Sequence, residues 1–462
     1  MRLFFHAPHR QWRSLTKKLR PRPQSAVAER SRSKIDQTCT RKVDAHPAVN
    51  LIAPVHDPCQ FVLAVYLHSV SITRATPGSQ TSLREANRAR IIAAVKRHGG
   101  LTQVELAGAT GLSPATVSNI VKELTASSVL HTTMTTRSGR RAQHVTLARA
   151  LGIVAGVHIS TRNMRIALAD VAGTVVAEHG MPLAKDHRAD NELDKVTQLI
   201  ADMLDSVEAS MDEILAVGIA LPAPVDARKG EISRSGLMRG WDGVSIAELM
   251  HRRIQRPVFV DNEANLGALA EFRLGAARGR RNSVYIRVGQ GIGAGLIMNG
   301  LVYRGFESSA GEFGHMTIDE HGPLCRCGNR GCLEAIAGGP AIIDGLRESN
   351  GPQKLTDVIV HATAGDHICI RAIADAGRHV GIAAANVCNL LAPERIVVGG
   401  ELARAGELFL GPLRHSLERS VVMSTDKVAD VVQGQLGDRA ELMGAVLYAI
   451  DRSTIGPDEI AL

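Results

Sequence analysis

Four side chains that bind soft metal ions stand close together between residues 315 and 332. His315 is followed by Cys325, Cys327 and Cys332, and the glycines between them let the chain curl so that the thiolates converge. Three thiolates and one imidazole are a common ligand set for tetrahedral zinc. Because the protein would fill all four positions, we expect a structural metal rather than a catalytic one. The alternative is three reduced cysteines beside a hydrogen-bonded histidine.

A second pattern, from Gln103 to Lys122, is typical of the helix-turn-helix of DNA-binding proteins. Ala107 is small where two helices would touch, and Gly111 supplies the positive φ of the turn between them. Ser113 can cap the second helix, and Pro114 suits its first turn. The residues spaced to fill a shared core are Leu106, Thr110, Leu112, Val117 and Ile120.

The second helix and the hairpin after it carry the side chains that we expect to face DNA. Those on the helix are the cap Ser113 and then Ala115, Thr116, Ser118, Asn119 and Lys122. At the tip of the hairpin, Arg137, Arg140 and Arg141 could hold phosphates or enter a minor groove. The alternatives are a small domain that binds protein, or a solvated charged face.

The elements that must position these residues follow from the periodicity. A helix from Ser82 is expected to end at Gly99-Gly100, followed by helices over 102–110 and 113–127 and a hairpin over 129–147 with its turn at 138–139. After Gly152, strand-like runs at 153–159, 164–169, 174–177 and 214–220 alternate with a helix near 193–207. Alternation of this kind predicts an α/β domain.

The net charge of the chain changes at about the same boundaries as the predicted elements. Residues 1–50 carry a net charge of +9, residues 51–80 carry none, residues 81–150 carry +7, and the remainder carries −8. A basic module beside an acidic body is typical of a nucleic-acid-binding head on a body that does not bind nucleic acid. We therefore divide the chain into an extension at 1–80, a winged helix-turn-helix at 81–148, a large domain at 152–450 and a tail at 451–462. The extension is basic and aperiodic. It is interpreted as disordered or over-annotated, with a DNA-supporting arm or a transit peptide as alternatives.

Composition places the protein in a reducing compartment. Seven cysteines in 462 residues do not form a secreted disulfide scaffold. No stretch reaches the roughly 20 apolar residues of a membrane span. The longest candidate, Phe61 to Ile72, is short and contains His68. The basic N-terminus has no apolar core behind it, so we expect no secretory signal, no membrane partner and a cytoplasmic protein.

The metal-binding pattern belongs to a longer signature. Gly311-Glu312-Phe313-Gly314-His315 followed by C-x-C-G-x-x-G-C-L-E resembles the ROK family (repressors, open reading frames, sugar kinases) over about residues 152–450. The winged helix in front matches the family's repressor branch. The resemblance implies an actin-like ATPase (ribonuclease H-like) fold with two α/β lobes around a cleft, and a homo-dimer or homo-tetramer. It also implies that the sugar is hydrogen-bonded by Asn262, Glu312, His315 and Glu334.

The phosphate-binding and catalytic positions depart from the pattern of the family's kinases. The first phosphate loop of those kinases, Asp-x-Gly-x-Thr, is matched by His158, Ser160 and Arg162. Gln290 replaces a threonine in the second loop, and Glu263 replaces the catalytic aspartate. A backbone that cradles phosphates does not readily tolerate such side chains. We therefore expect no kinase activity and no ATP or Mg²⁺.

Three functions remain open on the sequence. The first is a transcription regulator that binds a double-stranded DNA operator and responds to a sugar or sugar phosphate, with Glu263 accepting a sugar hydroxyl. The second is an active sugar kinase with an added domain, favoured by the glycines kept at 289–295 and 399–400. The third is a sugar-binding protein whose basic head binds another protein.

Overall fold

The computed structural model describes residues 80–137, 140–184, 186–233, 238, 240–347, 351–422 and 428–453. The predicted extension before Gln80, the turn at 138–139 and the tail after Ser453 lie outside these residues. Within the described ranges, no helix has the length and apolar character needed to cross a membrane.

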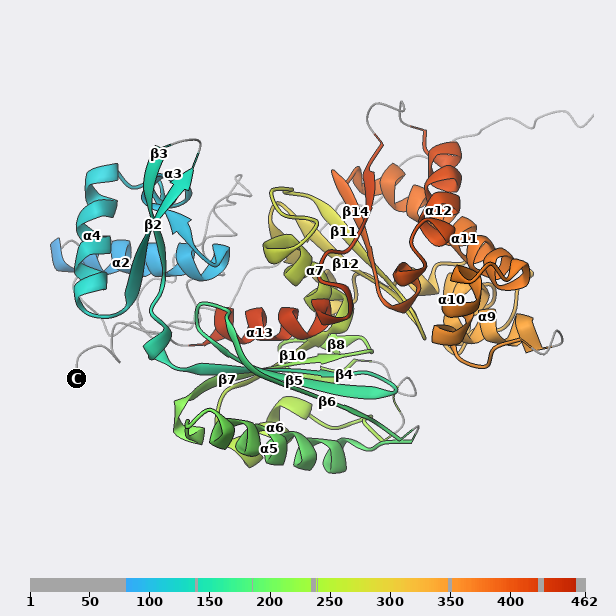
Figure 1. Cartoon of the computed structure of the whole chain (residues 1–462), viewed down its shortest axis with the longest axis horizontal. Helices are drawn as coiled ribbons and strands as arrows, with labels where there is room; N and C mark the ends of the chain where they lie inside the picture. Colours follow the sequence, from blue (N-terminus) through green and yellow to red (C-terminus); the bar gives the residue numbers. More distant parts are fainter. Residues whose placement is uncertain are drawn as a thin grey trace, which may run out of the picture. The chain divides into compact units, whose positions relative to one another are not determined.

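The N-terminal head is a three-helix unit with a small antiparallel sheet (Figure 1). Its elements are α2 (Gln80–His98), β1 (Leu101–Thr102), α3 (Gln103–Thr110), α4 (Pro114–Ala126), β2 (Leu130–Arg137) and β3 (Arg140–Leu147). The sheet order is β1-β3-β2. Apart from the short β1, which the sequence did not predict, these elements have nearly the predicted bounds.

Capping residues set where the helices of the head begin and end. Thr102 and Glu105 form a capping box at the start of α3, and Gly111 ends that helix with a φ of 68°. The Ser113 hydroxyl accepts a hydrogen bond from the Thr116 N–H at 3.1 Å and so caps α4. The residues buried between the helices and the sheet include Ile91, Leu106, Val117, Ile120 and Val145.

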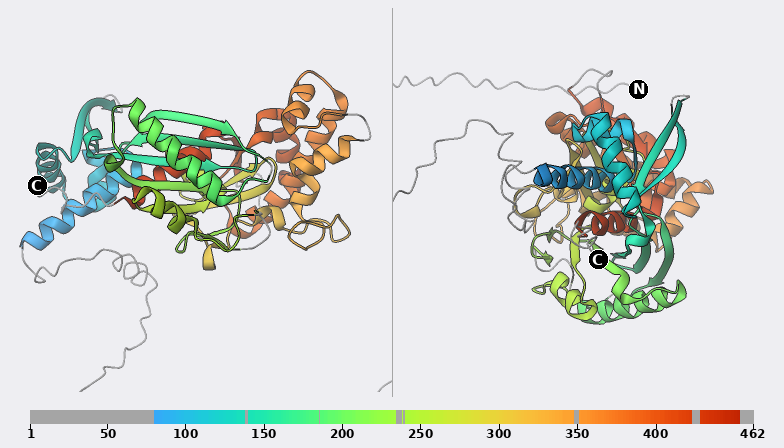
Figure 2. Two further views of the ribbon diagram at one scale, coloured as in Figure 1. Left: turned by 90° about the horizontal axis from the view of Figure 1, so that it is seen from below. Right: turned by 90° about the vertical axis from the view of Figure 1, so that its left-hand side faces the viewer.

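The first half of the body is a five-stranded sheet in the order β10-β7-β4-β5-β6. The strands are β4 (Ile153–Ile159), β5 (Asn163–Asp170), β6 (Val175–Pro182), β7 (Ile214–Leu221) and β10 (Val258–Asn262). Its outer face is covered by α5 (Ala189–Ser206) and α6 (Ile246–Ile254) (Figure 1; Figure 2, left). A two-stranded ribbon, β8 (Val225–Asp226) with β9 (Glu231–Ile232), follows β7.

The second half of the body repeats this sheet order as β13-β12-β11-β14-β15. The strands are β11 (Ser283–Val288), β12 (Ile292–Met298), β13 (Leu301–Tyr303), β14 (Arg395–Gly399) and β15 (Asp430–Gln433). Its helices are α8 (Leu333–Ala337), α9 (Gly339–Leu346), α10 (Leu355–Thr363), α11 (His367–Leu391) and α12 (Glu407–Ser420). In both sheets the first strand pairs antiparallel with the second and parallel with the fourth.

Two helices, α7 (Glu263–Leu274) and α13 (Ala440–Arg452), pack on the inner faces of these sheets and on each other. Glycine allows the close approach. A Cβ added at Gly444 would collide with the Leu266 carbonyl, and one added at Gly218 would collide with the Ala445 carbonyl. All residues of α13 from Ala440 to Ile450 are buried. The helix continues to Arg452, so the predicted domain end at 450 falls inside it.

The C-terminal end of α13 contacts the head. The Lys96 ammonium of α2 donates to the Ser453 carbonyl at 2.7 Å. Arg273 forms a bidentate ion pair with Asp451, at 2.8 and 2.6 Å, and also donates to the Lys96 carbonyl at 3.2 Å. Burial lowers the pKa of Lys96 to about 8, against the opposing charge of Asp451. The head is therefore attached to the body through these polar contacts and through apolar packing of its core against Val171 and Leu215.

Candidate functional site

A cavity of about 370 Å³ contains the residues that the sequence singled out for sugar binding. It is bounded by the β4–β5 turn, the start of α7, the glycine-rich turn between β11 and β12, and the segment before α8. All five predicted sugar-binding residues line it, namely Asn262, Glu263, Glu312, His315 and Glu334. The three residues of the first phosphate-loop position, His158, Ser160 and Arg162, line it as well, as does Gln290.

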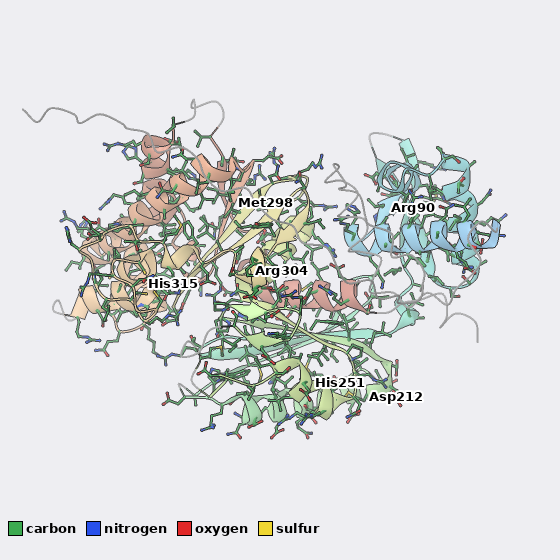
Figure 3. The ribbon with its side chains drawn as sticks, turned by 180° about the vertical axis from the view of Figure 1, so that it is seen from behind. Arg90, Asp212, His251, Met298, Arg304 and His315 are labelled. Atoms are coloured by element: carbon green, nitrogen blue, oxygen red, sulfur yellow. The ribbon has the colours of Figure 1, made fainter. Side chains whose placement is uncertain are left out.

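Asn262 is the N-cap of α7, and this fixes its side chain in the cavity wall. Its side-chain oxygen accepts from the Ala264 N–H at 2.8 Å, and its amide nitrogen donates to the Ala223 carbonyl at 2.8 Å. Asp261 beneath it is fully buried and pairs with Arg304, whose guanidinium lies 5.5 Å from the centre of the Tyr448 ring (Figure 3). The amide of Asn262 keeps one N–H and one lone pair for a ligand.

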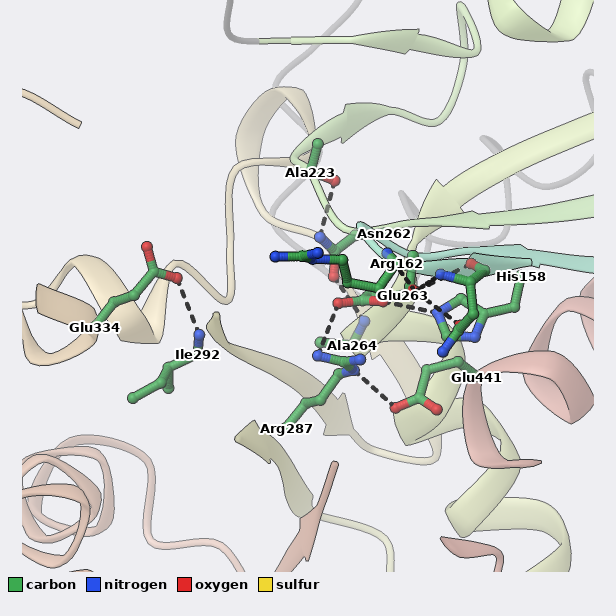
Figure 4. A network of polar contacts seen from close by, with 12 residues as sticks. His158, Arg162, Ala223, Asn262, Glu263, Ala264, Arg287, Ile292, Glu334 and Glu441 are labelled. Atoms are coloured by element: carbon green, nitrogen blue, oxygen red, sulfur yellow. Dashed lines mark hydrogen bonds and ion pairs between the residues drawn. The ribbon is translucent and has the colours of Figure 1, made fainter. Parts of the chain in front are cut away.

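Glu263 is held in a buried charge network (Figure 4). One of its oxygens lies 2.8 Å from Nε2 of His158, and the other lies 3.1 Å from Nη1 of Arg287. Burial alone would raise the pKa of Glu263, but the nearby Arg287 and the hydrogen bond with His158 lower it overall. Both oxygens of the carboxylate that the sequence proposed as a hydroxyl acceptor therefore already have partners within the protein.

Arg287, which the sequence analysis did not select, connects this network to α13. Its Nε lies 3.2 Å from Glu441, and Glu441 also accepts from the Tyr285 hydroxyl at 2.9 Å. One guanidinium thus neutralises two buried carboxylates from different helices. The available signal was a single arginine in the mostly apolar strand 283–288, which is a costly position for an unpaired charge.

The opposite side of the cavity is formed by Glu312, His315 and Glu334. Glu334 accepts from Arg326, at 2.7 Å from Nε and 3.1 Å from Nη2, and from the Ile292 N–H at 3.0 Å (Figure 4). The Nε2 atom of His315 faces Glu312 at 4.0 Å. This arrangement presents carboxylate and imidazole groups to the cavity, which is the chemistry that sugar hydroxyls require.

Three of the retained glycines, Gly291, Gly295 and Gly399, have packing roles that do not involve a nucleotide. A Cβ added at Gly291 would lie 2.7 Å from a Glu334 oxygen, and one at Gly295 would collide with the Ala264 carbonyl. At Gly399 an added Cβ would collide with the Tyr285 ring. These glycines are therefore required by the packing of α7, α8 and β11, and they do not by themselves favour a kinase.

The predicted metal ligands converge. His315, Cys325, Cys327 and Cys332 each offer a ligand atom, and these atoms all lie within 4.8 Å of one another. Nδ1 of His315 lies 3.6 Å from the Cys325 sulfur, and the sulfurs of Cys327 and Cys332 are 3.6 Å apart. The position of His315 in the body is marked in Figure 3. Burial and the neighbouring thiols raise the pKa of Cys332 to about 12. A soft cation would be needed to hold such a set of thiols as thiolates, so the donor set fits a structural metal.

The predicted DNA-facing residues of α4 are displayed on the surface. Ser113, Ala115, Ser118, Asn119 and Lys122 are exposed, and Thr116 is half-buried beside its hydrogen bond to Ser113. Arg141 on β3 is exposed too. The side chains of Arg137 and Arg140 lie outside what the structure describes, although their backbones pair at the end of the hairpin.

Comparison with known families agrees with the division of the chain into a DNA-binding head and a larger body. The sequence pattern of winged helix-turn-helix DNA-binding domains matches residues 84–130. The pattern of the ROK family matches residues 154–452. The chain belongs to the ROK family.

ROK regulators resemble the chain over its head and body together. The xylose repressor of Bacillus subtilis is 26% identical over 378 residues, which cover 80% of this chain and 97% of the repressor. The DNA-binding transcriptional dual regulator NagC of Escherichia coli is 27% identical over 388 residues, covering 79% of this chain and 94% of NagC.

Solved ROK structures match either the head and the body together or the body alone. A ROK transcriptional regulator homologous to the Escherichia coli MLC protein superposes with a TM-score of 0.65 at 24% identity, covering 80% of this chain and 96% of its own. A ROK glucokinase of Streptomyces griseus, in complex with glucose and AMPPNP, gives 0.57 at 26% identity and covers 64% of this chain and 99% of its own. The predicted family and the two-lobed fold with a winged helix in front are thereby confirmed.

Proposed function

We propose that this ROK protein is a sugar-responsive, DNA-binding transcription regulator and that its kinase-like body binds a sugar without phosphorylating it. The observation that carries the proposal is the presence, in one chain, of a capped helix-turn-helix with an exposed polar recognition face and a cavity lined by the predicted hydroxyl-binding residues. The alignments with the xylose repressor and with NagC extend over both parts of this chain and cover 97% and 94% of those proteins.

The geometry of Glu263 supports binding rather than catalysis. A general base must be able to take a proton from the attacking hydroxyl. Here the carboxylate is paired with Arg287 and His158, and its lowered pKa makes it a weak base. Arg162 also projects a guanidinium from the turn in which the kinases have a phosphate-binding threonine.

The cysteine cluster is proposed to hold one zinc ion. When bound, zinc would cross-link the loop between His315 and Cys332, and it would leave no open coordination position for chemistry. Nδ1 of His315 faces the thiols while Nε2 faces Glu312 in the cavity. The metal would therefore fix the orientation of one sugar-binding side chain.

A gel-shift assay tests the regulator directly. Purified full-length protein is incubated with genomic fragments from around its own gene, with and without a panel of aldoses and amino sugars. We expect specific retardation of at least one fragment and a change in affinity with one sugar class. A coupled assay for ATP consumption with the same sugars is run in parallel. Steady sugar-dependent turnover would support the kinase instead, and absence of specific retardation would remove the regulator.

A further inference from the structure

Most charges in the cavity neutralise one another. Five arginines line it, and four of them have an acidic partner: Arg165 with Glu178, Arg287 with Glu263 and Glu441, Arg326 with Glu334, and Arg404 with Asp438. The fifth, Arg162, is exposed. Within the part of the chain that the structure describes, its guanidinium has no hydrogen-bond or ion-pair partner.

The turn that carries Arg162 is fixed at its backbone. The Ser160 hydroxyl accepts from the N–H groups of Arg162 and Asn163, at 3.3 and 3.1 Å, and donates to the Asn163 side chain at 2.8 Å. The Arg162 carbonyl accepts from the Leu183 N–H at 2.8 Å. Ser160 is thus a structural residue of this turn, and it holds the backbone from which the Arg162 side chain projects.

The Arg162 side chain points into the cavity. Figure 4 shows it extending past Asn262 and Glu263 towards the space in front of Glu334 and Ile292. A sugar whose hydroxyls contact Glu312, His315 and Glu334 would therefore present its opposite end to this guanidinium. Arginine offers a planar fork of donors that matches a phosphate or carboxylate.

We propose that the effector is an acidic sugar, carrying a phosphate or a carboxylate, and that Arg162 is the residue that selects it. This inference rests on the proposed function, since it concerns the same cavity. It follows from the position of this one guanidinium and not from an overall positive charge, since the cavity lining holds more carboxylates than arginines. An acidic group at this end would give Arg162 the ion-pair partner that it lacks among the described residues, whereas a neutral sugar would leave its guanidinium to water.

Isothermal titration of the full-length protein tests the selection. The probes are glucose, N-acetylglucosamine and xylose, their terminal phosphates, glucuronate, and inorganic phosphate alone. We expect one acidic sugar to bind at least tenfold more tightly than its neutral parent. Comparison of the phosphates with glucuronate identifies the acidic group. The advantage is expected to shrink as salt is raised, because the arginine is exposed.

Variants at position 162 assign the effect to this side chain. Arg162→Met removes the charge without removing a side-chain hydrogen bond or ion pair within the described chain, so it should fold. We expect the affinity for the acidic sugar to fall by about tenfold to a hundredfold, which is the range for a charge-assisted hydrogen bond. The affinity for the neutral parent sugar should change by no more than about twofold. Arg162→Lys should keep part of the preference, because lysine retains the charge but not the fork. Arg347→Met, which changes an exposed arginine outside the cavity, is the matched control.

The inference is overturned if acidic and neutral sugars bind equally well, or if no acidic probe binds. It is also overturned if the preference for the acidic sugar persists in Arg162→Met, or if ATP competes with the sugar in a way that depends on Arg162. If a neutral sugar alters DNA retardation equally in the wild type and Arg162→Met, the acidic effector is rejected while the regulator stands. If the DNA fragments are not retarded at all, it is the regulator that fails.

Discussion

At the scale of single residues, the pairing of Arg287 decides what Glu263 can do. The guanidinium is the shared counter-ion of two carboxylates that are almost fully buried, Glu263 and Glu441. The arginine has two counter-ions, whereas each carboxylate has this guanidinium as its main counter-ion. Removing the arginine is therefore costly, and the three side chains give the floor of the cavity a fixed geometry.

Replacing Arg287 by methionine tests this dependence. The change leaves two buried carboxylates without their main counter-charge, so we expect a loss of about 3–5 kcal/mol in the free energy of unfolding. Urea denaturation at pH 7 measures it. The double variant Arg287→Met/Glu263→Gln removes one of the stranded charges and should recover part of the loss. A single variant as stable as the wild type would contradict the role given to Arg287.

The pH dependence of the same variant gives a second readout. In the wild type the pKa of Glu263 is lowered, so the folded carboxyl binds fewer protons than the unfolded one. Its stabilising contribution is complete above the unfolded pKa of about 4.3 and is lost as pH falls through the folded pKa. In Arg287→Met the largest influence that lowers the pKa of Glu263 is gone, and burial is opposed only by His158 and the weaker charge of Arg326, so the pKa should rise above the unfolded value. Stability should then decrease as pH rises from 4 to 7, which urea titrations across that range would detect.

The cysteine cluster makes a prediction about metal content. Cys327→Ser removes one of four converging ligands, and we expect bound zinc to fall from about one per chain to well below one, with a lower melting temperature. Cys388→Ser alters a buried thiol on α11 outside the cluster and should leave the zinc content unchanged. Elemental analysis of both proteins and a melt with and without chelator provide the test. Equal zinc in both variants would exclude this ligand set.

At the scale of secondary-structure elements, α4 should behave as a recognition helix. Lys122→Ala is expected to weaken binding to all DNA sequences alike and to reduce the slope of log affinity against log salt by about one. Asn119→Ala should instead weaken the specific fragment by about 1–3 kcal/mol and leave non-specific binding unchanged. Fluorescence anisotropy at several salt concentrations separates the two. If neither variant changes the affinity for DNA, α4 does not face it.

Local signals predicted the elements of the head and much of the first sheet. Gly111, Ser113 and Pro114 define a turn and a helix start within a few residues, and the apolar run 153–159 is β4 as observed. The repeated order of the two sheets was not predicted, because it is a property of strand pairing and not of any sequence period. The strand β1 was missed because two residues carry no periodicity.

The site was predicted in composition but not in its internal pairing. The residues of the signature do line one cavity. One partner of Glu263, His158, lies 105 positions earlier in the chain, and the other, Arg287, lies near the end of β11. Contacts of this range depend on the packing of α7 and α13 between the sheets, and no local pattern records them. Arg326, which lies between two predicted zinc ligands, pairs with Glu334 only eight positions later, and this contact is set by the fold of the cysteine-containing loop.

At the scale of the whole molecule, α13 joins the cavity to the head. Its first turn carries Glu441, which contacts Arg287, and its last turn carries Asp451, which pairs with Arg273. Arg273 in turn donates to Lys96 of α2. A rigid helix with a polar contact at each end provides a continuous physical connection, and the coupling itself must be measured.

Variants at the junction measure that coupling. Asp451→Asn weakens the ion pair with Arg273, and Lys96→Met removes the hydrogen bond to Ser453. Each is expected to reduce the effector-dependent change in DNA affinity by about 0.5–2 kcal/mol while DNA binding and effector binding taken singly are retained. Arg256→Gln, which breaks an exposed pair with Asp212, is the control. An effector response equal to that of the control would show that the signal does not pass through this junction.

The position of α13 also affects how the protein is made. The inner face of the first sheet stays open until this helix, the last that the structure describes, has been made, whereas α7 packs on the inner face of the second sheet. On the ribosome, the head can fold early, because nearly all of its buried core comes from its own residues and only Val171 is contributed by the body. The body must wait until almost the whole chain has been translated. A premature stop shortly before codon 440 would therefore release an intact DNA-binding head without a completed body. Such a fragment would bind operators but could not respond to the effector, so nonsense mutations near the end of the gene should be dominant.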